Sequence, residues 1–438
     1  MKTSILFCLL LALSSITFGQ HQLRGIVSDA NTHKKLSGAT LIIEPSGKAT
    51  ATNENGIFLF RTISKGTKQL KISFVGYQPK TITLDIQKDT IFDFKISKTD
   101  HEIKPIVILA DRPKSKLEEI PTQVAVVSKE EYSTFPVQNF DDILQSIPNV
   151  YVNRSWGIFS KNSSVSMRGL DGTSRVLVLY NGVPLNKTAG GGINWHIINT
   201  DDIQQVEVQK GPSSALYGNN AMTGVINILT KKSKERLAIN LSTFVGRYKT
   251  LGGKFNVSQN LRDTTNKGFY YNMSGFYRQG DGYNIIPADL ANETNIPLYL
   301  TEYQGKALVG YGFNTDHFFE TEYTFYNDNR GEGIKVYEED GGHLSYNVHY
   351  IRSTYHTKAG EIPINVNFFY HNQDFKQHSE RLNQTGDTYK LYDRNQETND
   401  AGIWINASHK ISENQNLVFG IDGKTGSVLS EEIYRTST

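Results

Sequence analysis

The sequence predicts a mainly β protein in three parts: an N-terminal β-sandwich, a small mixed α/β unit, and an incomplete antiparallel transmembrane β-barrel. Three observations predict this class. Short alternating runs separated by turn residues fill the first part, four apolar runs with a Gly-Pro elbow fill the second, and longer strands of period two fill the third. The changes of pattern predict these boundaries: 1–19 (export signal), 20–99 (sandwich), 100–116 (linker), 117–235 (α/β unit) and 236–438 (barrel strands).

Composition bounds the class of protein. The 438 residues carry 46 Lys and Arg against 44 Asp and Glu, and this balance gives no electrostatic support for nucleic-acid binding. Only 38% of the residues are hydrophobic, and the 23 Tyr and 22 Phe crowd into the C-terminal half. This composition is typical of a transmembrane β-barrel, because lipid-facing and lumen-facing side chains alternate along each strand.

The first 19 residues are typical of an export signal peptide. Lys2 provides the positive start, residues 5–13 form the apolar core, and small residues fit a cleavage site before Gln20. The apolar core is too short to span a bilayer, which needs about 20 residues. Cys8 is the single cysteine and lies inside this signal, so we expect no disulfide and no thiol chemistry in the mature chain.

Residues 20–99 contain runs such as GIVSD, ATLIIEP, GIFLFRTI and LKISFVGY, with turn residues between them. A spacing of about 8 to 12 residues between turns predicts a small antiparallel β-sandwich. No catalytic grouping is found in this part. We interpret Asp29 and His33 as turn residues rather than as ligands.

The mixed α/β unit has strands and helix caps that can be read directly. Asn181-Gly182 favours a tight turn, because both residues tolerate positive φ. Ser128 is expected to cap one helix and Asn139 a second one. The expected strands of the unit lie at 164–167, 175–180, 203–209 and 225–230.

Four blocks of this unit carry a resemblance to a known family. RGLDG, LVLYNGVPLN, IQQVEVQKGPSSALYG and AMTGVINILTKK resemble, in order and spacing, the plug domain of the TonB-dependent outer-membrane receptors. The preceding sandwich is similar to the carboxypeptidase-regulatory-like domain that often precedes such plugs. The resemblance implies a receptor in the cell outer membrane, with the N-terminal domain and the plug facing the periplasm and a 22-stranded barrel around the plug.

The linker 100–116 contains an apolar stretch that is interrupted by a proline. Because proline cannot donate to a central ladder, the stretch predicts an edge strand or an added strand. The resemblance implies that this is the TonB box, which pairs by strand addition with the TonB energy-transducing complex; a plain linker strand is the alternative. The residues expected in the box are Ile103, Pro105, Ile106, Val107, Ile108 and Leu109.

Two loops of the α/β unit, 154–164 and 186–197, are rich in glycine, aromatic and amide residues. The resemblance implies that loops at these positions contact a small-molecule ligand. Rigid aromatic area with a few polar groups suits such binding, and packing of the same side chains against the barrel wall is the alternative. The candidate ligand-binding residues are Trp156, Phe159, Asn186, Trp195 and His196.

The C-terminal half alternates apolar and polar residues, as in FFETEYTF. This alternation predicts that Glu320 and Glu322 point into the lumen, and we expect them to form ion pairs with Arg168 and Arg175 on plug strands. After the first hairpin, short and long connections alternate, as periplasmic turns and outer loops do in outer-membrane barrels. The expected strands are 237–246, 250–260, 268–279, 301–312, 317–327, 345–357, 363–372, 399–409 and 415–423.

These strands are too few to close the barrel that the resemblance implies. An open edge in lipid would leave unpaired backbone groups that cost several kcal/mol each. The last residues, EEIYRTST, also lack the aromatic final strand expected of such barrels. The sequence therefore leads us to expect a fragment or a truncated gene product.

The motif search yields no catalytic residues, no metal site and no cofactor, so we do not expect an enzyme. The GKT at 423–425 lacks the first glycine of a phosphate loop. The expected function is active uptake of a scarce ligand, either a siderophore or other metal chelate or cobalamin, which GVINILTKK and LYNGVPLN favour. A glycan importer of the starch-utilisation type, and a surface receptor that binds or signals without transport, are the alternatives.

Overall fold

The computed structural model describes residues 20–30, 32–44, 46–74, 77–97, 106–107, 115–116, 123–160, 162–170, 173–232, 235–383, 385–386, 388–412 and 415–437. The expected signal peptide lies outside these residues. The chain divides into two units, Met1–Lys104 and Pro105–Thr438. None of the helices in the described part of the chain combines the length and the apolar character that a membrane crossing needs.

The N-terminal unit is a β-sandwich, as the sequence predicts. One sheet has the order β4-β1-β7 with β8 also paired to β1, and the other has the order β3-β2-β5-β6. Inward side chains from both sheets form one core, in which Phe58 stacks on Phe94 at 5.7 Å between ring centroids. The strands are β1 Gln20–Asp29, β2 Thr40–Glu44, β3 Lys48–Ala51, β4 Ile57–Ser64, β5 Gly66–Ser73, β6 Lys80–Ile86, β7 Thr90–Ile91 and β8 Phe94–Ile96.

Asp29 is the last residue of β1, and His33 lies in the turn that follows, where its amide donates to the Asp29 carbonyl at 3.1 Å. One carboxylate oxygen of the buried Asp29 accepts from the Thr32 amide at 2.7 Å, and the other accepts from the Tyr77 hydroxyl at 2.7 Å. The hydrogen bond from the Tyr77 hydroxyl to Asp29 raises the pKa of Tyr77 above its ordinary value. His33 adopts a φ of 57° within the same turn.

The second unit begins with the plug, for which we use the described residues from 123 to 232. Its main sheet has the order β11-β16-β17-β14-β15, in which β14 and β17 run parallel and the other pairs antiparallel. A separate pair, β12-β13, packs beside helix α3. The strands are β11 Gln123–Ser128, β12 Val150–Asn153, β13 Ser164–Met167, β14 Val176–Tyr180, β15 Val183–Pro184, β16 Ile203–Lys210 and β17 Gly224–Thr230, and the helices are α2 Lys129–Tyr132, α3 Phe140–Gln145 and α4 Ser214–Tyr217.

Local signals fix the ends of these elements. The Ser128 hydroxyl accepts from the Glu131 amide at 3.3 Å and so caps α2, while Asn139 occupies the N-cap of α3. Asn181 and Gly182 both have positive φ, as the tight turn requires. Every residue of β14 is buried, because this strand is paired on both sides inside the sheet.

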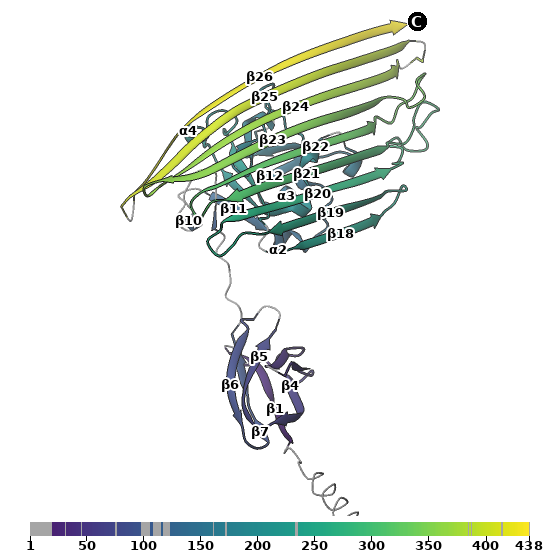
Figure 1. Cartoon of the computed structure of the whole chain (residues 1–438). Coiled ribbons are helices and arrows are strands. Elements are labelled where there is room, and N and C mark those ends of the chain that lie inside the picture. Colours follow the sequence, from purple (N-terminus) through teal and green to yellow (C-terminus); the bar gives the residue numbers. More distant parts are fainter. Residues whose placement is uncertain are drawn as a thin grey trace, which may run out of the picture. The chain divides into compact units, whose positions relative to one another are not determined.

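Nine antiparallel strands, β18 to β26, follow in sequence order and form one sheet that we call the wall. Figure 1 shows the plug elements lying against one face of this sheet. Each strand pairs with the next in unbroken register, apart from one irregularity near the start of β26. The strands are β18 Ala238–Val245, β19 Leu251–Asn260, β20 Gly268–Gly280, β21 Leu300–Gly312, β22 Phe318–Gly331, β23 His343–Ala359, β24 Ile362–Leu382, β25 Tyr389–Ser412 and β26 Gln415–Ser437.

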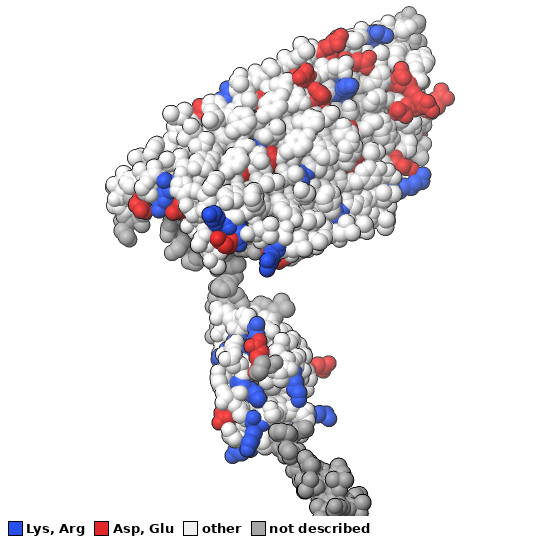
Figure 2. All heavy atoms as spheres, in the orientation of Figure 1, with Lys and Arg blue, Asp and Glu red and all other residues white. Residues whose placement is uncertain are grey.

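The two faces of the wall have opposite chemistry. On β22, Glu320, Glu322 and Thr324 are buried, whereas Phe319 and Tyr323 are exposed on the other face. The outward face seen in Figure 2 is largely uncharged across its middle, and charged residues gather toward its rims. A polar inner face and an apolar outer face are what a β-wall between lipid and a lumen requires.

The connections confirm the predicted alternation with one correction. Long loops at 281–299 and 332–342 alternate with short connections such as 313–317 and 360–361. The expected long loop at 373–398 is wrong, because β24 continues to Leu382 and β25 already begins at Tyr389. Polar residues dominate this segment, and their cross-strand pairing does not show as an apolar alternation.

Candidate functional site

The contact between the plug and the wall is the candidate functional site. Plug and wall side chains share one core, in which Tyr180 meets Tyr350 at 6.5 Å and His196 stacks on Tyr326 at 6.3 Å between ring centroids. Around this core, buried side chains of the wall bind polar or charged groups of the plug at three main places. Because both partners are largely buried there, water competes little with these contacts.

The first place is centred on Asp202, immediately before β16. Its carboxylate accepts from Lys306 at 2.8 Å, from the Ser274 hydroxyl at 2.6 Å and from the Asn256 amide at 2.9 Å. These three side chains come from adjacent strands, where Asn256 is opposite Ser274 and Ser274 is opposite Lys306. Asp202 and Lys306 are only 3% and 4% exposed, so this is a buried ion pair with all its carboxylate bonds satisfied by the wall.

The second place is centred on Arg330, which is fully buried. Its guanidinium donates to Glu302 at 2.5 Å and to Asp328 at 2.6 Å within the wall. The same guanidinium donates to the carbonyls of Ile158 at 2.8 Å and Ser160 at 3.0 Å, which belong to a plug loop. One wall side chain thus holds the backbone of this loop through charge-assisted hydrogen bonds.

A neighbouring arginine extends this second cluster to helix α3. Arg278 binds Glu302 through Nε at 2.5 Å, and its Nη2 donates to the Asn139 side-chain oxygen at 2.8 Å. Asn139 is therefore both the N-cap of α3 and a contact of the wall. Within the plug, burial raises the pKa of Asp141, and the nearby Arg154 opposes that shift.

The third place holds the plug segment after β15. Both oxygens of Asp400 accept from the Thr188 amide, at 3.1 and 3.2 Å, and Lys424 donates to the Asn186 carbonyl. Burial lowers the pKa of Lys187 in the same segment, an effect that Asp400 opposes. The wall strands that hold this segment, β25 and β26, are far in sequence from those that hold Asp202.

The predicted ion pairs involve other partners than expected. Glu320 and Glu322 are buried and lie 3.1 and 3.5 Å from Arg352, and the register places Arg352 directly opposite Glu322. Arg168 instead occupies a turn and donates to the Lys210 carbonyl at 3.2 Å, and Arg175 is exposed. Among the described residues, the pairing of these two arginines with Glu320 and Glu322 is therefore wrong, because a cross-strand arginine satisfies the carboxylates first.

One plug residue does reach this carboxylate cluster. Lys232, just after β17, lies 3.8 Å from Glu320 and over the ring of Phe318. A cavity of about 210 Å³ lies beside it, lined by plug and wall residues that include Asn181, Tyr270 and Asn367. Sequence reasoning missed Asp202, Lys306 and Arg330, whose pairing depends on strand register.

The candidate ligand-binding residues are mostly core residues. Trp195 is 1% exposed, stacks on Phe140 at 5.5 Å and donates to the Ser163 carbonyl at 3.1 Å. Phe159 and His196 are also buried. The Asn186 side chain accepts from the Val178 amide at 2.7 Å and so braces its own loop. Packing against the core and the wall thus occupies four of the five, and Trp156 alone keeps partial exposure.

The long wall loops pack over the plug loop that carries Phe159. Phe159 meets Tyr283 edge-on at 6.0 Å and shares a small apolar cluster with Leu298 and Leu300. The two long loops are tied together, since the Ile296 amide donates to the Gly333 carbonyl at 3.1 Å. These contacts bring the two long loops and the plug loop together at the end of the wall that carries the longer connections.

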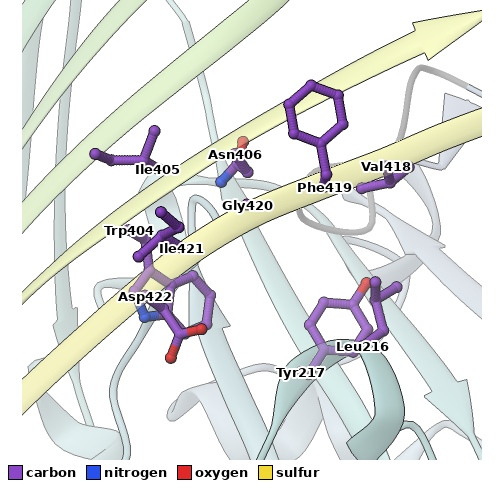
Figure 3. A pocket seen from close by; sticks show the side chains of 10 residues that line it. All are labelled: Leu216, Tyr217, Trp404, Ile405, Asn406, Val418, Phe419, Gly420, Ile421 and Asp422. Atoms are coloured by element: carbon purple, nitrogen blue, oxygen red, sulfur yellow. The ribbon is translucent and has the colours of Figure 1, made fainter.

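A second cavity, of about 150 Å³, lies where helix α4 meets the last two strands (Figure 3). Leu216 and Tyr217 face it from α4, and Trp404 and Asn406 face it from β25. Its lining combines apolar groups with the amide of Asn406 and the carboxylate of Asp422. The described residues hold no group of three or more His, Cys, Asp or Glu side chains placed to bind a metal ion.

The predicted TonB box lies mostly outside the described residues. Ile103, Pro105, Ile108 and Leu109 are not described, and Ile106–Val107 form strand β9. This strand pairs antiparallel with β10, Ser115–Lys116. The prediction that this segment recruits a partner strand is not tested by that pairing.

Comparisons with known proteins agree with this architecture. The family model of the TonB-dependent Receptor Plug Domain matches residues 116–225, and that of the CarboxypepD_reg-like domain matches residues 23–108. The vitamin B12 transporter BtuB of Vibrio vulnificus (strain CMCP6) is 30% identical over 184 residues, which are 41% of this chain and 28% of that protein.

Solved structures of the same architecture are similar in fold. The ferric yersiniabactin uptake receptor FyuA of Yersinia pestis gives a TM-score of 0.54 at 17% identity, over 72% of this chain and 50% of that one. The ferripyoverdine receptor of the Pseudomonas aeruginosa outer membrane gives a TM-score of 0.57 at 12% identity, over 79% and 49%. The chain thus spans 28% of the BtuB relative and about half of these solved receptors.

A folded plug held on the polar face of a β-wall whose other face is apolar defines the class of plugged β-barrel proteins. Within that class, the matches of residues 116–225 to the plug domain and of residues 23–108 to the domain before it make the chain similar to the TonB-dependent receptors, and the fold of the wall agrees with that of solved receptors.

Proposed function

We propose that this receptor imports a scarce ligand across the outer membrane, and that the ligand is cobalamin or a metal chelate such as a ferric siderophore. The relative BtuB is a vitamin B12 transporter, and two structural neighbours are receptors of ferric yersiniabactin and ferripyoverdine. The proposal rests on one observation above all, namely that the plug fills the polar side of the wall through buried charged contacts at Asp202, Arg330 and Asp400.

Such contacts have a mechanistic consequence. A ligand can pass between plug and wall only if some of these hydrogen bonds are broken or exchanged, which costs free energy. We infer that this free energy comes from the TonB complex, which would pull on the segment 103–109 directly before the plug. The outer membrane is then the location of the protein, with the N-terminal domain and the plug on the periplasmic side and the long loops 281–299 and 332–342 on the outer side.

An uptake experiment tests the ligand class. A strain lacking the gene is complemented with it and supplied separately with labelled cyanocobalamin, labelled ferric siderophore, or a labelled starch oligosaccharide. Uptake of either of the first two that depends on the gene supports the proposal. If only uptake of the oligosaccharide depends on the gene, the proposal is overturned in favour of the glycan alternative.

Removal of the segment before the plug tests coupling. Deletion of 103–109 is expected to abolish uptake and to leave binding of the same labelled ligand to whole cells unchanged. A shortened sandwich loop, with 46–47 deleted, is the matched control and should change neither quantity. Uptake that survives the deletion of 103–109 would contradict coupling through this segment, and a receptor that binds but never imports would support the signalling alternative.

A further inference from the structure

The outer face of the β4-β1-β7 sheet carries exposed apolar side chains arranged around an arginine. In the sheet register, Arg24 on β1 lies between Leu59 on β4 and Ile91 on β7, and Ile26 lies opposite Ile57 in the next row. Ile57, Leu59 and Ile91 are 42%, 38% and 62% exposed. We call this set of five residues the Arg24 face. Apolar side chains gathered in this way are typical of surfaces that bind another protein.

Cations surround the Arg24 face. Arg61 follows Leu59 on β4, and Lys35 and Lys95 are both paired with Ser28, which points to the same side of β1 as Arg24. Two carboxylates close to Ile91 in the sequence, Asp89 and Asp93, accept hydrogen bonds from main-chain amides of β1 at 2.9 and 3.2 Å. In the described part of the chain, no hydrogen bond or ion pair engages the guanidinium of Arg24.

The charge of the whole unit agrees with this local excess. Residues 20–97 contain eleven Lys and Arg against six Asp and Glu, a net charge of +5, whereas the full chain has a net charge of +2. In Figure 2, more of the visible surface of this unit belongs to Lys and Arg than to Asp and Glu. Such a surface attracts a partner of opposite charge and speeds its association.

The edge of the sheet offers less room for a partner than its face. The Asn53 amide donates to the Ile57 carbonyl at 2.9 Å, and Lys48 donates to the Thr62 carbonyl at 2.5 Å. Polar groups along β4 are therefore already engaged near both ends, as is usual where an edge strand is protected from strand addition. Side-chain packing on the face is the remaining mode of contact.

We propose that the Arg24 face docks a protein partner whose surface presents apolar side chains around an Asp or Glu carboxylate. Arginine with flanking apolar residues is typical of the energetic centre of a protein interface, and its guanidinium binds a carboxylate in two-point geometry. The exposed apolar residues of the Arg24 face are all aliphatic, and the face lacks the Trp and Tyr that membrane-surface binding favours. This assigns the N-terminal unit a recruiting role that goes beyond ligand uptake and does not depend on the ligand.

Site-specific crosslinking in cells that express the full chain tests the proposal. A photoreactive amino acid is placed at Leu59 or Ile91 and, as a control, at Thr83, which is exposed on the other sheet. The expected result is one crosslinked protein from the first two positions and none from Thr83. Crosslinks to lipid alone, crosslinks to a second copy of this chain, equal labelling at Thr83, or no crosslink would each overturn the proposal.

Charge reversal then tests the chemistry of the contact. The crosslinked protein is purified, and its affinity for the full-length receptor is measured with Arg24→Glu and, as a control of equal charge change, with Lys71→Glu on the other sheet. We expect the affinity to fall at least tenfold for the first variant and to stay unchanged for the second. Replacing the partner's carboxylate residue next to the crosslinked position by lysine should restore the affinity for Arg24→Glu. Equal losses for both variants, or no loss for Arg24→Glu, would overturn the proposal. Thermal unfolding of each variant verifies that the exposed substitutions leave the sandwich folded.

Discussion

Asp201 and Asp202 are neighbours in sequence and face different environments. The Asp201 carboxylate is 47% exposed and lies 3.5 Å from Lys254, whereas Asp202 is buried and binds three wall side chains. Exposed ion pairs contribute about 0 to 1 kcal/mol, and loss of one partner of a buried pair costs about 3 to 5 kcal/mol. Two adjacent residues therefore separate the effect of burial from the effect of charge.

Asp202→Asn is expected to lower the free energy of unfolding of the plug by about 3 to 5 kcal/mol, because Lys306 stays buried without its counter-charge. Asp201→Asn, the matched control, should lower it by less than about 1 kcal/mol. Urea unfolding in detergent, followed by the fluorescence of the buried Trp195, measures both. Equal effects of the two substitutions would contradict the role given to Asp202.

Lys231 gives the plug a predicted pH dependence. Burial, assisted by the nearby Lys129, lowers the pKa of Lys231 from 10.5 to about 8. Between these two values the unfolded chain binds more protons than the folded one, so the free energy of unfolding rises with pH in this window. Below about pH 8 both states are protonated, and the full cost of the buried charge is present.

Lys231→Gln should remove this contribution, so that stability rises less between about pH 8 and pH 10 than in the unsubstituted protein. Lys232→Gln is the control, since the Lys232 side chain is 63% exposed. Denaturant midpoints of the three proteins at both pH values give the comparison. A pH profile unchanged by Lys231→Gln would show that another group titrates.

For single residues, the sequence predicts which face of a strand a side chain points to better than it predicts which side chain it pairs with. The alternation on β22 correctly places Glu320 and Glu322 on the buried face. Their partner, Arg352, lies about 30 residues further along the chain, and only the register of two strands brings it opposite Glu322. The surroundings of the aromatic candidates were not predictable for the same reason, because the contact between Trp195 and Phe140 depends on tertiary packing.

Among the elements, the long loop 332–342 shows how a connection is held in one conformation. One oxygen of Glu380 on β24 accepts from the Val336 amide at 2.8 Å, and the other accepts from the Tyr337 amide at 2.9 Å. A third amide, of Glu338, and the Tyr389 hydroxyl complete the set. A single carboxylate thus orders a loop turn in the way that a carboxylate orders a helix N-terminus.

Glu380→Gln should loosen this loop. The substituted side chain keeps only one acceptor oxygen, and hydrogen bonds to a charged group contribute about 1.5 to 3 kcal/mol each. Trypsin cleavage after Lys335, inside the loop, should therefore become at least about tenfold faster. Glu397→Gln, whose exposed carboxylate accepts from Asn399 at 2.8 Å, is the control and should leave the cleavage rate unchanged.

Elements with a strong apolar period were predicted closely, and those with polar pairing were not. Strand β13, at Ser164–Met167, has the predicted bounds, and the start of β19 differs by one residue. In contrast, β26 extends from Gln415 to Ser437, well beyond the predicted end at residue 423. Beyond the apolar band, strand pairing is carried by backbone hydrogen bonds and polar cross-strand contacts, which leave no period-two signal.

For the whole molecule, the opposite chemistry of the two wall faces decides where it can reside. Ile351 lies in the middle of β23 on the outward face, and Asn347 is on the same face four residues closer to the end with the long loops. The distance along the strand is about 13 Å. The two positions therefore sample different depths of the proposed membrane.

Ile351→Arg should lower the stability of the protein in lipid bilayers by about 2 to 4 kcal/mol, the cost of arginine near the midplane. Asn347→Arg should cost about 0 to 1 kcal/mol, because arginine there reaches the interface. Unfolding of the two variants in phospholipid vesicles provides the test. Equal costs at both depths would argue against a membrane around this face.

The fold class and the match of the plug to its domain family were predictable at this scale, since four sequence blocks and the alternating strands carry them. The contacts that fix the plug were not, because each joins residues that are 54 to 238 positions apart, such as Asn256 to Asp202 and Lys424 to Asn186. Sequence periodicity specifies faces, and contacts across such separations follow only from the assembled sheet.

The row formed by Asn256, Ser274 and Lys306 has a consequence for assembly. A slip of any of these strands by one residue would turn its polar side chain toward lipid and an apolar one toward Asp202. The carboxylate would then be enclosed without donors, so a mispaired wall could not accept the plug at low free energy. Docking of the plug therefore favours the one hydrogen-bonding register that places these three donors around Asp202.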